Sequence, residues 1–524
     1  MEILPSILLL LAAVAAMSWL SQKVAIPAPV LFSIAGVAWS LLAHMPKLEI
    51  TPAIVLAVFL PPLLYADAWQ ASWLDFRRWL RPILQLAIGL VVFTILSVGV
   101  VAHVLMPRLP WGACFLLGGI VSMTDTIAVH SVLERLRVPR RATAILGGES
   151  LINDATGLLG VELATVVVLS GAFETYEIGL GFARIAGLGV VVGVVVGLTA
   201  AKINQVVRGT PVLFTLSLVA PYGAYFLAER VGSSGVLATV IAGFVASWRV
   251  HYIAPESRVA LYASWEQLAF LLNALMFVYI GLETPARLVQ ALETMPGIVS
   301  VALAVSATVI LARFVWIFPN AYLPLWLFPG LRRREGTYPS PRAVMLVSWC
   351  GVRGAVSLAA ALSLPLTLAD GTPFPGREQI VACTLAVILI TLVGQGTTLL
   401  PLARRLGLED AEPAEEEALK ARATMLAAGI ARLDAFCTEE KCPIAVFRLR
   451  EAMVDQLEAL KTEDESERTQ ARQRLAVTEE VRRAVYEAQS RALLQLRDRE
   501  EVNDRVHQFL QLDLDRANAE ARPA

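Results

Sequence analysis

Charge is scarce through most of this chain. Residues 1–408 contain 19 acidic and 26 basic residues, whereas residues 409–524 contain 26 acidic and 18 basic ones. An average soluble domain is about 25% charged, so the first part is too poor in charge to be one. The mean hydropathy of the whole chain is +0.62. This division predicts a transmembrane domain over 1–408 and a cytosolic helical tail over 409–524.

Cysteine and histidine are also rare, with five of each. Cys114, Cys350 and Cys383 lie in apolar runs, where cysteine behaves as a small hydrophobe. Cys437 and Cys442 have no histidine cluster nearby. The pattern indicates neither a disulfide framework nor a zinc site. The chain also lacks the P-loop motif, which argues against an ATP-driven pump.

The first twenty residues contain no lysine or arginine. A secretory signal peptide needs a basic segment before its apolar core, so we expect a retained first helix instead. A spanning helix needs about 20 mostly apolar residues. Thirteen stretches meet this requirement: 4–22, 27–44, 50–66, 82–106, 111–133, 147–171, 182–202, 211–229, 233–248, 265–283, 297–328, 343–368 and 378–401. The eleventh is rich in proline after Pro319 and is expected to end early.

The loops between these stretches differ in basic residues. Alternate loops hold 18 Lys or Arg on one side and 6 on the other. Cytoplasmic loops carry the excess of basic residues, so the N-terminus is predicted to be outside and the C-terminus inside. Two six-helix units joined by one extra helix would have opposite orientations. We therefore predict an all-α membrane protein with two inverted six-helix repeats.

Several charged residues interrupt the apolar runs. A charged side chain in the bilayer core costs at least about 2.5–3.5 kcal/mol, so each needs a partner, a water-filled cavity or both. They lie in the fifth, sixth, eleventh and twelfth stretches and comprise Asp125, Glu149, Asp154, Glu162, Arg313 and Arg353.

The start of the sixth stretch groups oxygen-bearing side chains. Glu149 and Asn153 are four residues apart, as are Ser150 and Asp154, so each pair shares one helical face. Carboxylate, amide and hydroxyl oxygens are hard ligands, suited to an alkali cation rather than a soft metal.

Glycines lie close to the charged residues of the fifth and twelfth stretches. Gly118 and Gly119 precede Asp125, and Gly351 and Gly354 flank Arg353. Such placement in corresponding helices of two repeats predicts interrupted helices that cross at mid-membrane, where unwound carbonyls complete an ion site.

Two long motifs carry a family resemblance. Gly148-Glu-Ser-Leu-Ile-Asn-Asp-Ala-Thr156 resembles the helix-six signature of the sodium/proton exchanger family, in its electroneutral Asn-Asp branch of bacterial type. The run from Trp349 to Pro365 is similar to the twelfth-helix signature of the same family. Weaker matches at Leu60–Asp67, Phe277–Leu282 and Gln395-Gly396 extend the resemblance over most of residues 1–408, but not over the tail.

The resemblance implies a role for each matching residue. Asp154 would bind either the cation or the proton, with Asn153 marking the electroneutral branch. Ser150 and Thr124 would supply further oxygen ligands to the alkali cation. Asp125 would contribute to the site from the interrupted fifth helix.

A second group of roles is structural. Glu149 is expected to pair with Arg353, and Arg313 to neutralise a helix end or pair elsewhere. Glu162 is expected to face another helix or the outer surface, and Asp67 to lie at the rim of a pathway or to have no role. The family usually has proline after the fifth-helix aspartate, where this chain has Thr126. This departure leaves the site geometry and the ion preference open.

The expected activity is exchange of protons for Na⁺, with Li⁺ or K⁺ as further candidates, in the inner (plasma) membrane and without a cofactor. The family pattern also implies a homodimer in contact with membrane lipid. A cytosolic regulator could bind the tail. A K⁺/H⁺ antiporter is the nearest alternative, and a non-transporting membrane sensor is another. An intramembrane aspartyl protease also needs two membrane aspartates, but it requires glycine before the second, where this chain has Asn153. No enzymatic activity and no nucleic-acid partner are expected.

Overall fold

The computed structural model divides the chain into two compact units, Met1–Asp410 and Ala411–Ala524. In the first unit it describes residues 3–24, 26–42, 55–125, 129, 138–170, 175–207, 209–250, 253–331, 338–368 and 371–408. In the second it describes residues 412–435, 444–461 and 483–496, with single positions at 499, 510, 511 and 514. The division lies two residues from the boundary expected from charge.

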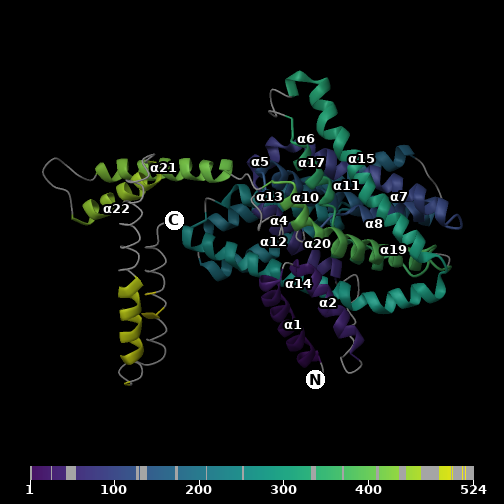
Figure 1. The fold of residues 1–524 in the computed structure, drawn as a ribbon, viewed down its shortest axis with the longest axis horizontal. Helices are drawn as coiled ribbons and strands as arrows, with labels where there is room; N and C mark the ends of the chain where they lie inside the picture. The colour runs from purple at the N-terminus through teal and green to yellow at the C-terminus, as the bar shows by residue number, and fades with distance from the viewer. Residues whose placement is uncertain are drawn as a thin grey trace. The chain divides into compact units, whose positions relative to one another are not determined.

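The described part of the first unit is built from helices (Figure 1). In chain order they are α1 (Ile3–Lys23), α2 (Ala28–Leu41), η1 (Val55–Phe59), α4 (Leu60–Gln70), α5 (Trp73–Arg78), α6 (Leu80–Leu84), η2 (Gln85–Leu90), α7 (Val91–Leu105), α8 (Trp111–Ser122), α10 (Arg140–Ser170), α11 (Thr175–Val206), α12 (Thr210–Arg230), α13 (Gly235–Trp248), α14 (Pro255–Thr294), α15 (Ile298–Leu327), α17 (Pro341–Trp349), α18 (Ala355–Leu362), α19 (Arg377–Leu389), η4 (Ile390–Gln395) and α20 (Gly396–Arg405). The η elements are π-helical turns within longer helices.

Seven helical segments in the described residues are long and apolar enough to cross a membrane. Four shorter apolar helices accompany them, including α8 and α13. Each of the thirteen expected stretches contains at least one helix, although the number of spans stays a prediction.

Several helices extend beyond the expected stretches. α14 extends over 40 residues because its polar ends continue the helix beyond the apolar run. α10 begins at Arg140, seven residues early. The eleventh stretch was expected to end early, and this prediction is wrong: α15 continues to Leu327 with Pro319 and Pro324 inside it.

Small residues allow the closest helix packing. α2 and α14 approach each other at Gly36 and Gly281, where an added Cβ would collide with the backbone of the other helix. Because lipid tails are as apolar as leucine, such close van der Waals packing is what holds membrane helices together. α10 lies at the centre of the unit and packs against α8, α13, α17 and α18 (Figure 1).

The described part of the second unit contains α21 (Glu412–Asp434) and α22 (Ile444–Lys461), which pack against each other. Residues 483–496 are also helical. Helices are what the tail composition predicts.

Candidate ion-binding site

Two helices lose their regular backbone at the same place. α8 ends at Ser122 and continues as extended chain through Met123, and five residues separate α17 from α18. The backbone N–H of Asp125 donates a 2.8 Å hydrogen bond to the carbonyl of Val352. The two unwound segments therefore satisfy part of each other's backbone, which an interrupted helix needs in a membrane.

Glycine makes this approach possible. A Cβ added at Gly354 would collide with the carboxylate of Asp125. The φ angle of Gly354 is −130°, which any residue adopts, so space rather than backbone strain selects glycine here. The expected glycine-flanked break in the twelfth stretch is therefore present, and it packs directly on Asp125.

Arg353 closes the end of α8. Its Nη1 donates a 2.6 Å hydrogen bond to the carbonyl of Ser122, and its backbone N–H donates to Thr391 Oγ1 at 3.1 Å. The last carbonyls of a helix lack partners and carry partial negative charge. The buried guanidinium, 1% exposed, therefore holds the break by binding the negative end of α8.

Side chains of α10 face the unwound segment after α8. Asn153 donates from Nδ2 to Thr124 Oγ1, and Ser150 donates to the Thr124 carbonyl at 3.4 Å. Asn153 is buried, and among the described residues its Oδ1 has no hydrogen-bond partner. An amide oxygen in this state is available to a cation or a water molecule.

These elements enclose a small cavity of about 40 Å³. One water needs roughly 10–15 Å³ by the same kind of measure, so the cavity can hold an ion with few waters. Its polar lining consists of Asp67, Thr124, Asp125, Ser150, Asp154, Asn273 and Ser357. The remaining walls are apolar, mainly leucine, methionine and phenylalanine side chains. The cavity thus gathers hard oxygen ligands from five separate segments.

Comparison with known proteins identifies the family. The family model described as "Sodium/hydrogen exchanger, transmembrane" matches residues 8–405. The chain belongs to the sodium/hydrogen exchanger family.

Relatives of this exchanger-family chain include a sodium, potassium, lithium and rubidium/H⁺ antiporter of Bacillus pumilus, 31% identical over 77% of this chain and 61% of the relative. An uncharacterized Na⁺/H⁺ exchanger of Mycobacterium tuberculosis is 31% identical over 97% of this chain and 94% of the relative. The chain thus spans less than two thirds of the first relative and nearly all of the second.

The fold is similar to that of a solved structure. The sodium proton antiporter MjNhaP1 of Methanocaldococcus jannaschii matches with a TM-score of 0.59 and 21% identity, over 78% of this chain and 99% of that one. The exchanger-family chain is therefore a multi-pass membrane protein with this antiporter fold, and the resemblance noted in its motifs is confirmed.

One expected pairing in this exchanger-family chain is wrong. Glu149 pairs with Arg313 rather than Arg353, through bonds of 2.5 and 3.1 Å that use both carboxylate oxygens. Arg313 Nη2 also donates to the Val347 carbonyl at 3.1 Å. Helical spacing predicts which face of α10 carries Glu149. Which arginine binds its carboxylate depends on how α15 and α17 pack against that face.

Sequence reasoning missed two lining residues and underestimated a third. Asn273 is a single amide in the apolar run of α14, which is a signal that could have found it. Ser357 lies one turn beyond Arg353, and its buried hydroxyl has no partner among the described residues. Asp67, expected to lie at the rim of a pathway or to have no role, lines the same cavity as Asp154.

Two other residues singled out from the sequence lie elsewhere. Glu162 is exposed on α10 and does not line the cavity. Thr126 is outside the described residues. Among the residues that the structure describes, no group of three His, Cys, Asp or Glu side chains could hold a metal ion. The alkali-cation set expected from the sequence, Asp154, Ser150 and Thr124, has one carboxylate and two hydroxyls, and all three residues line the cavity.

Proposed function

We propose that this protein exchanges protons for a monovalent cation across the membrane, with Na⁺ as the first candidate. The observation that carries the proposal is the position of Asp154, 8% exposed, in a cavity lined by hydroxyl, amide and carboxylate oxygens at the crossing of two broken helices. The Bacillus pumilus relative is named as an antiporter of sodium, potassium, lithium and rubidium, which supports an alkali cation.

Competition at Asp154 is sufficient for exchange. One carboxylate cannot hold a proton and a cation together, because protonation removes the charge that attracts the cation. Ser150 and Thr124 supply neutral oxygen ligands, and Asn153 orients the Thr124 hydroxyl. Asp125 contributes from the unwound segment after α8. If only the loaded site alternates between the two faces, uptake of one ion requires release of the other.

A single exchanging carboxylate makes the cycle electroneutral, one proton for one cation. Asn153 supports this proposal because the side chain next to Asp154 on α10 is an amide, which does not titrate. A voltage-sensitive dye in sealed vesicles tests this, because its fluorescence reports any membrane potential. We expect exchange to leave that fluorescence unchanged. Exchange that itself generates a membrane potential would contradict electroneutrality.

The proposed membrane is the bacterial inner membrane, with the N-terminus outside and the C-terminus in the cytoplasm. The excess of basic residues in alternate loops supports this orientation. We also propose a homodimer, supported by the family pattern alone, and a cytosolic role for the acidic tail.

The ion specificity is tested with a pH gradient in inside-out vesicles. We expect added Na⁺ to collapse the gradient in wild-type vesicles and not in vesicles containing Asp154→Asn. Parallel additions of Li⁺ and K⁺ rank the three ions by how strongly each collapses the gradient. If only K⁺ collapses it, the substrate is K⁺ rather than Na⁺. No collapse with any of the three ions, in folded protein between about pH 6 and 9, would overturn the proposed exchange.

A further inference from the structure

A second, larger cavity lies away from the proposed ion site. It encloses about 360 Å³, within the range of about 300–1,000 Å³ that is typical of small-molecule sites. Its walls come from α6, η2, α15 and the first turns of α10 and α17. None of its described lining residues belongs to the Asp154 cavity.

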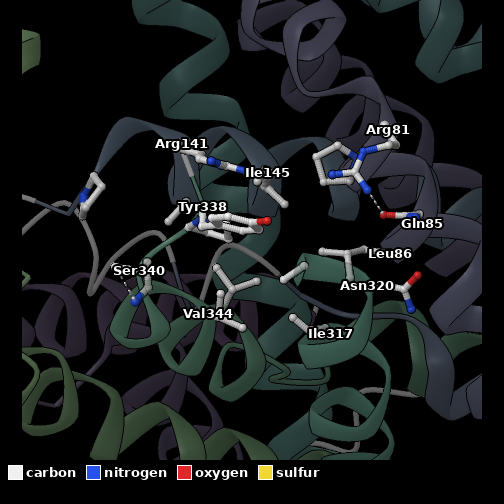
Figure 2. Close-up of a pocket in the computed structure, with 17 residues that line it drawn as sticks. Arg81, Gln85, Leu86, Arg141, Ile145, Ile317, Asn320, Tyr338, Ser340 and Val344 are labelled. Atoms are coloured by element: carbon white, nitrogen blue, oxygen red, sulfur yellow. Dashed lines mark hydrogen bonds between the residues drawn. The ribbon is translucent and has the colours of Figure 1, made fainter. Parts of the chain in front are cut away.

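The lining combines polar and apolar side chains. In the view of Figure 2, Arg81 and Arg141 lie in the upper part of the pocket, and Val344 and Ile317 in the lower part. Among the described lining residues, two are arginines and none is a carboxylate. A pocket of this kind favours an anion attached to an apolar group.

Both arginines are held in place. Arg81 donates from Nη1 to Gln85 Oε1 at 3.1 Å, and the guanidinium of Arg141 lies 4.4 Å from the centre of the Trp79 ring. Ser340 caps α17 by accepting from the N–H of Ala343 at 3.2 Å. The pocket also lies at the N-terminal ends of α10 and α17, and the N-terminus of a helix carries partial positive charge.

The pocket continues into a groove that runs along α6 and η2. Three arginines line the groove, Arg77, Arg78 and Arg81, and it shares Arg81, Gln85 and Asn320 with the pocket. Its apolar lining includes Leu84, Ile88 and Trp316. Leu84 and Ile88 are 36% and 39% exposed, which in a membrane-spanning segment places them against lipid.

We propose that this pocket and groove bind an anionic phospholipid of the membrane leaflet on the arginine-rich side. The phosphate would lie between Arg81 and Arg141, and one acyl chain would follow the groove past Leu84 and Ile88. Arginine matches the planar geometry of a phosphate better than lysine does. The bound lipid would connect α10, which carries Asp154, to α17, which leads into the unwound Val352 segment.

Binding is measured by the shift in Tm of the purified full-length protein in detergent. We expect phosphatidylglycerol to raise Tm by about 3 °C or more and zwitterionic phosphatidylethanolamine to raise it by less than half as much. The double variant Arg81→Gln/Arg141→Gln is expected to lose most of the shift. The matched control Arg405→Gln removes one exposed arginine at the end of α20 and should keep the whole shift.

Three outcomes would overturn the lipid proposal. The first is an equal Tm shift with phosphatidylglycerol and phosphatidylethanolamine. The second is a full phosphatidylglycerol shift in the double variant. The third is a loss of that shift in Arg405→Gln as large as in the double variant. Glycerol phosphate is added separately: if it stabilises as well as phosphatidylglycerol, the pocket binds a soluble phosphate instead. Should the double variant fail to fold, Ala321→Phe fills the pocket while keeping both arginines, and loss of the shift there supports the proposal, whereas a full shift contradicts it.

Discussion

At the scale of single residues, Glu149 and Arg313 show how burial determines the cost of a charge. Their side chains are 2% and 1% exposed and share two hydrogen bonds. Removing one partner of such a pair leaves the other charge buried, at a cost of about 3–5 kcal/mol. Loss of either partner therefore destabilises the contact between α10 and α15, although neither residue lines the cavity of the proposed site.

A double-mutant cycle tests this pairing. We expect Glu149→Gln and Arg313→Gln each to lower Tm strongly, and the double variant to lower it by less than the sum of the two, with a coupling of about 1 kcal/mol or more. The measurement is thermal unfolding of the purified variants. The same cycle with Arg353→Gln is the control, and a larger coupling of Glu149 to Arg353 than to Arg313 would refute the assignment.

At the scale of elements, the site depends on two broken helices that meet. The hydrogen bond from Asp125 N–H to the Val352 carbonyl and the bond from Arg353 to the Ser122 carbonyl hold the unwound segments together. Gly354 leaves just enough room for the Asp125 carboxylate. A side chain at this position would force the two segments apart.

The variant Gly354→Ala tests the crossing. Its Cβ would collide with Asp125, and overpacking of this kind costs about 1–3 kcal/mol, so we expect a lower Tm and loss of pH-gradient collapse in vesicles. Gly394→Ala is the matched control, because an added Cβ at Gly394 meets no atom within 4 Å. Normal transport by Gly354→Ala would show that the close approach is not needed.

The sequence predicts much of this arrangement because helical spacing and local breaks are short-range properties. The four-residue spacing of Ser150 and Asp154 places both on the cavity, and the glycines around Arg353 mark a real break. Contacts between helices are long-range. For that reason the partner of Glu149 was predicted incorrectly, and Asn273, which has no charge to mark it, was missed.

At the scale of the whole molecule, the charge division predicts a membrane domain followed by an acidic helical tail. The two compact units divide within two residues of the expected position. Basic residues are three times more frequent in one set of loops than in the other, 18 against 6. This asymmetry is the only basis for the proposed orientation, so it needs a direct test.

Cysteine labelling provides that test. In a variant without the five native cysteines, Arg108→Cys is expected to react with a membrane-impermeant maleimide added to intact cells. Arg405→Cys should react only after the membrane is opened. Both arginines are exposed in the structure, so accessibility differs by membrane side alone. The reverse labelling pattern would place the N-terminus inside.

Competition between proton and cation at Asp154 is the central claim, and the pH dependence of the apparent KM for Na⁺ tests it most directly. Initial exchange rates are measured in vesicles over a series of Na⁺ concentrations and pH values. At pH values where Asp154 is mostly protonated, competition for one carboxylate predicts that the apparent KM for Na⁺ rises about tenfold for each unit by which the pH falls. The maximal rate should stay unchanged. A KM that stays constant while the maximal rate falls would contradict competition and place the proton on a different group.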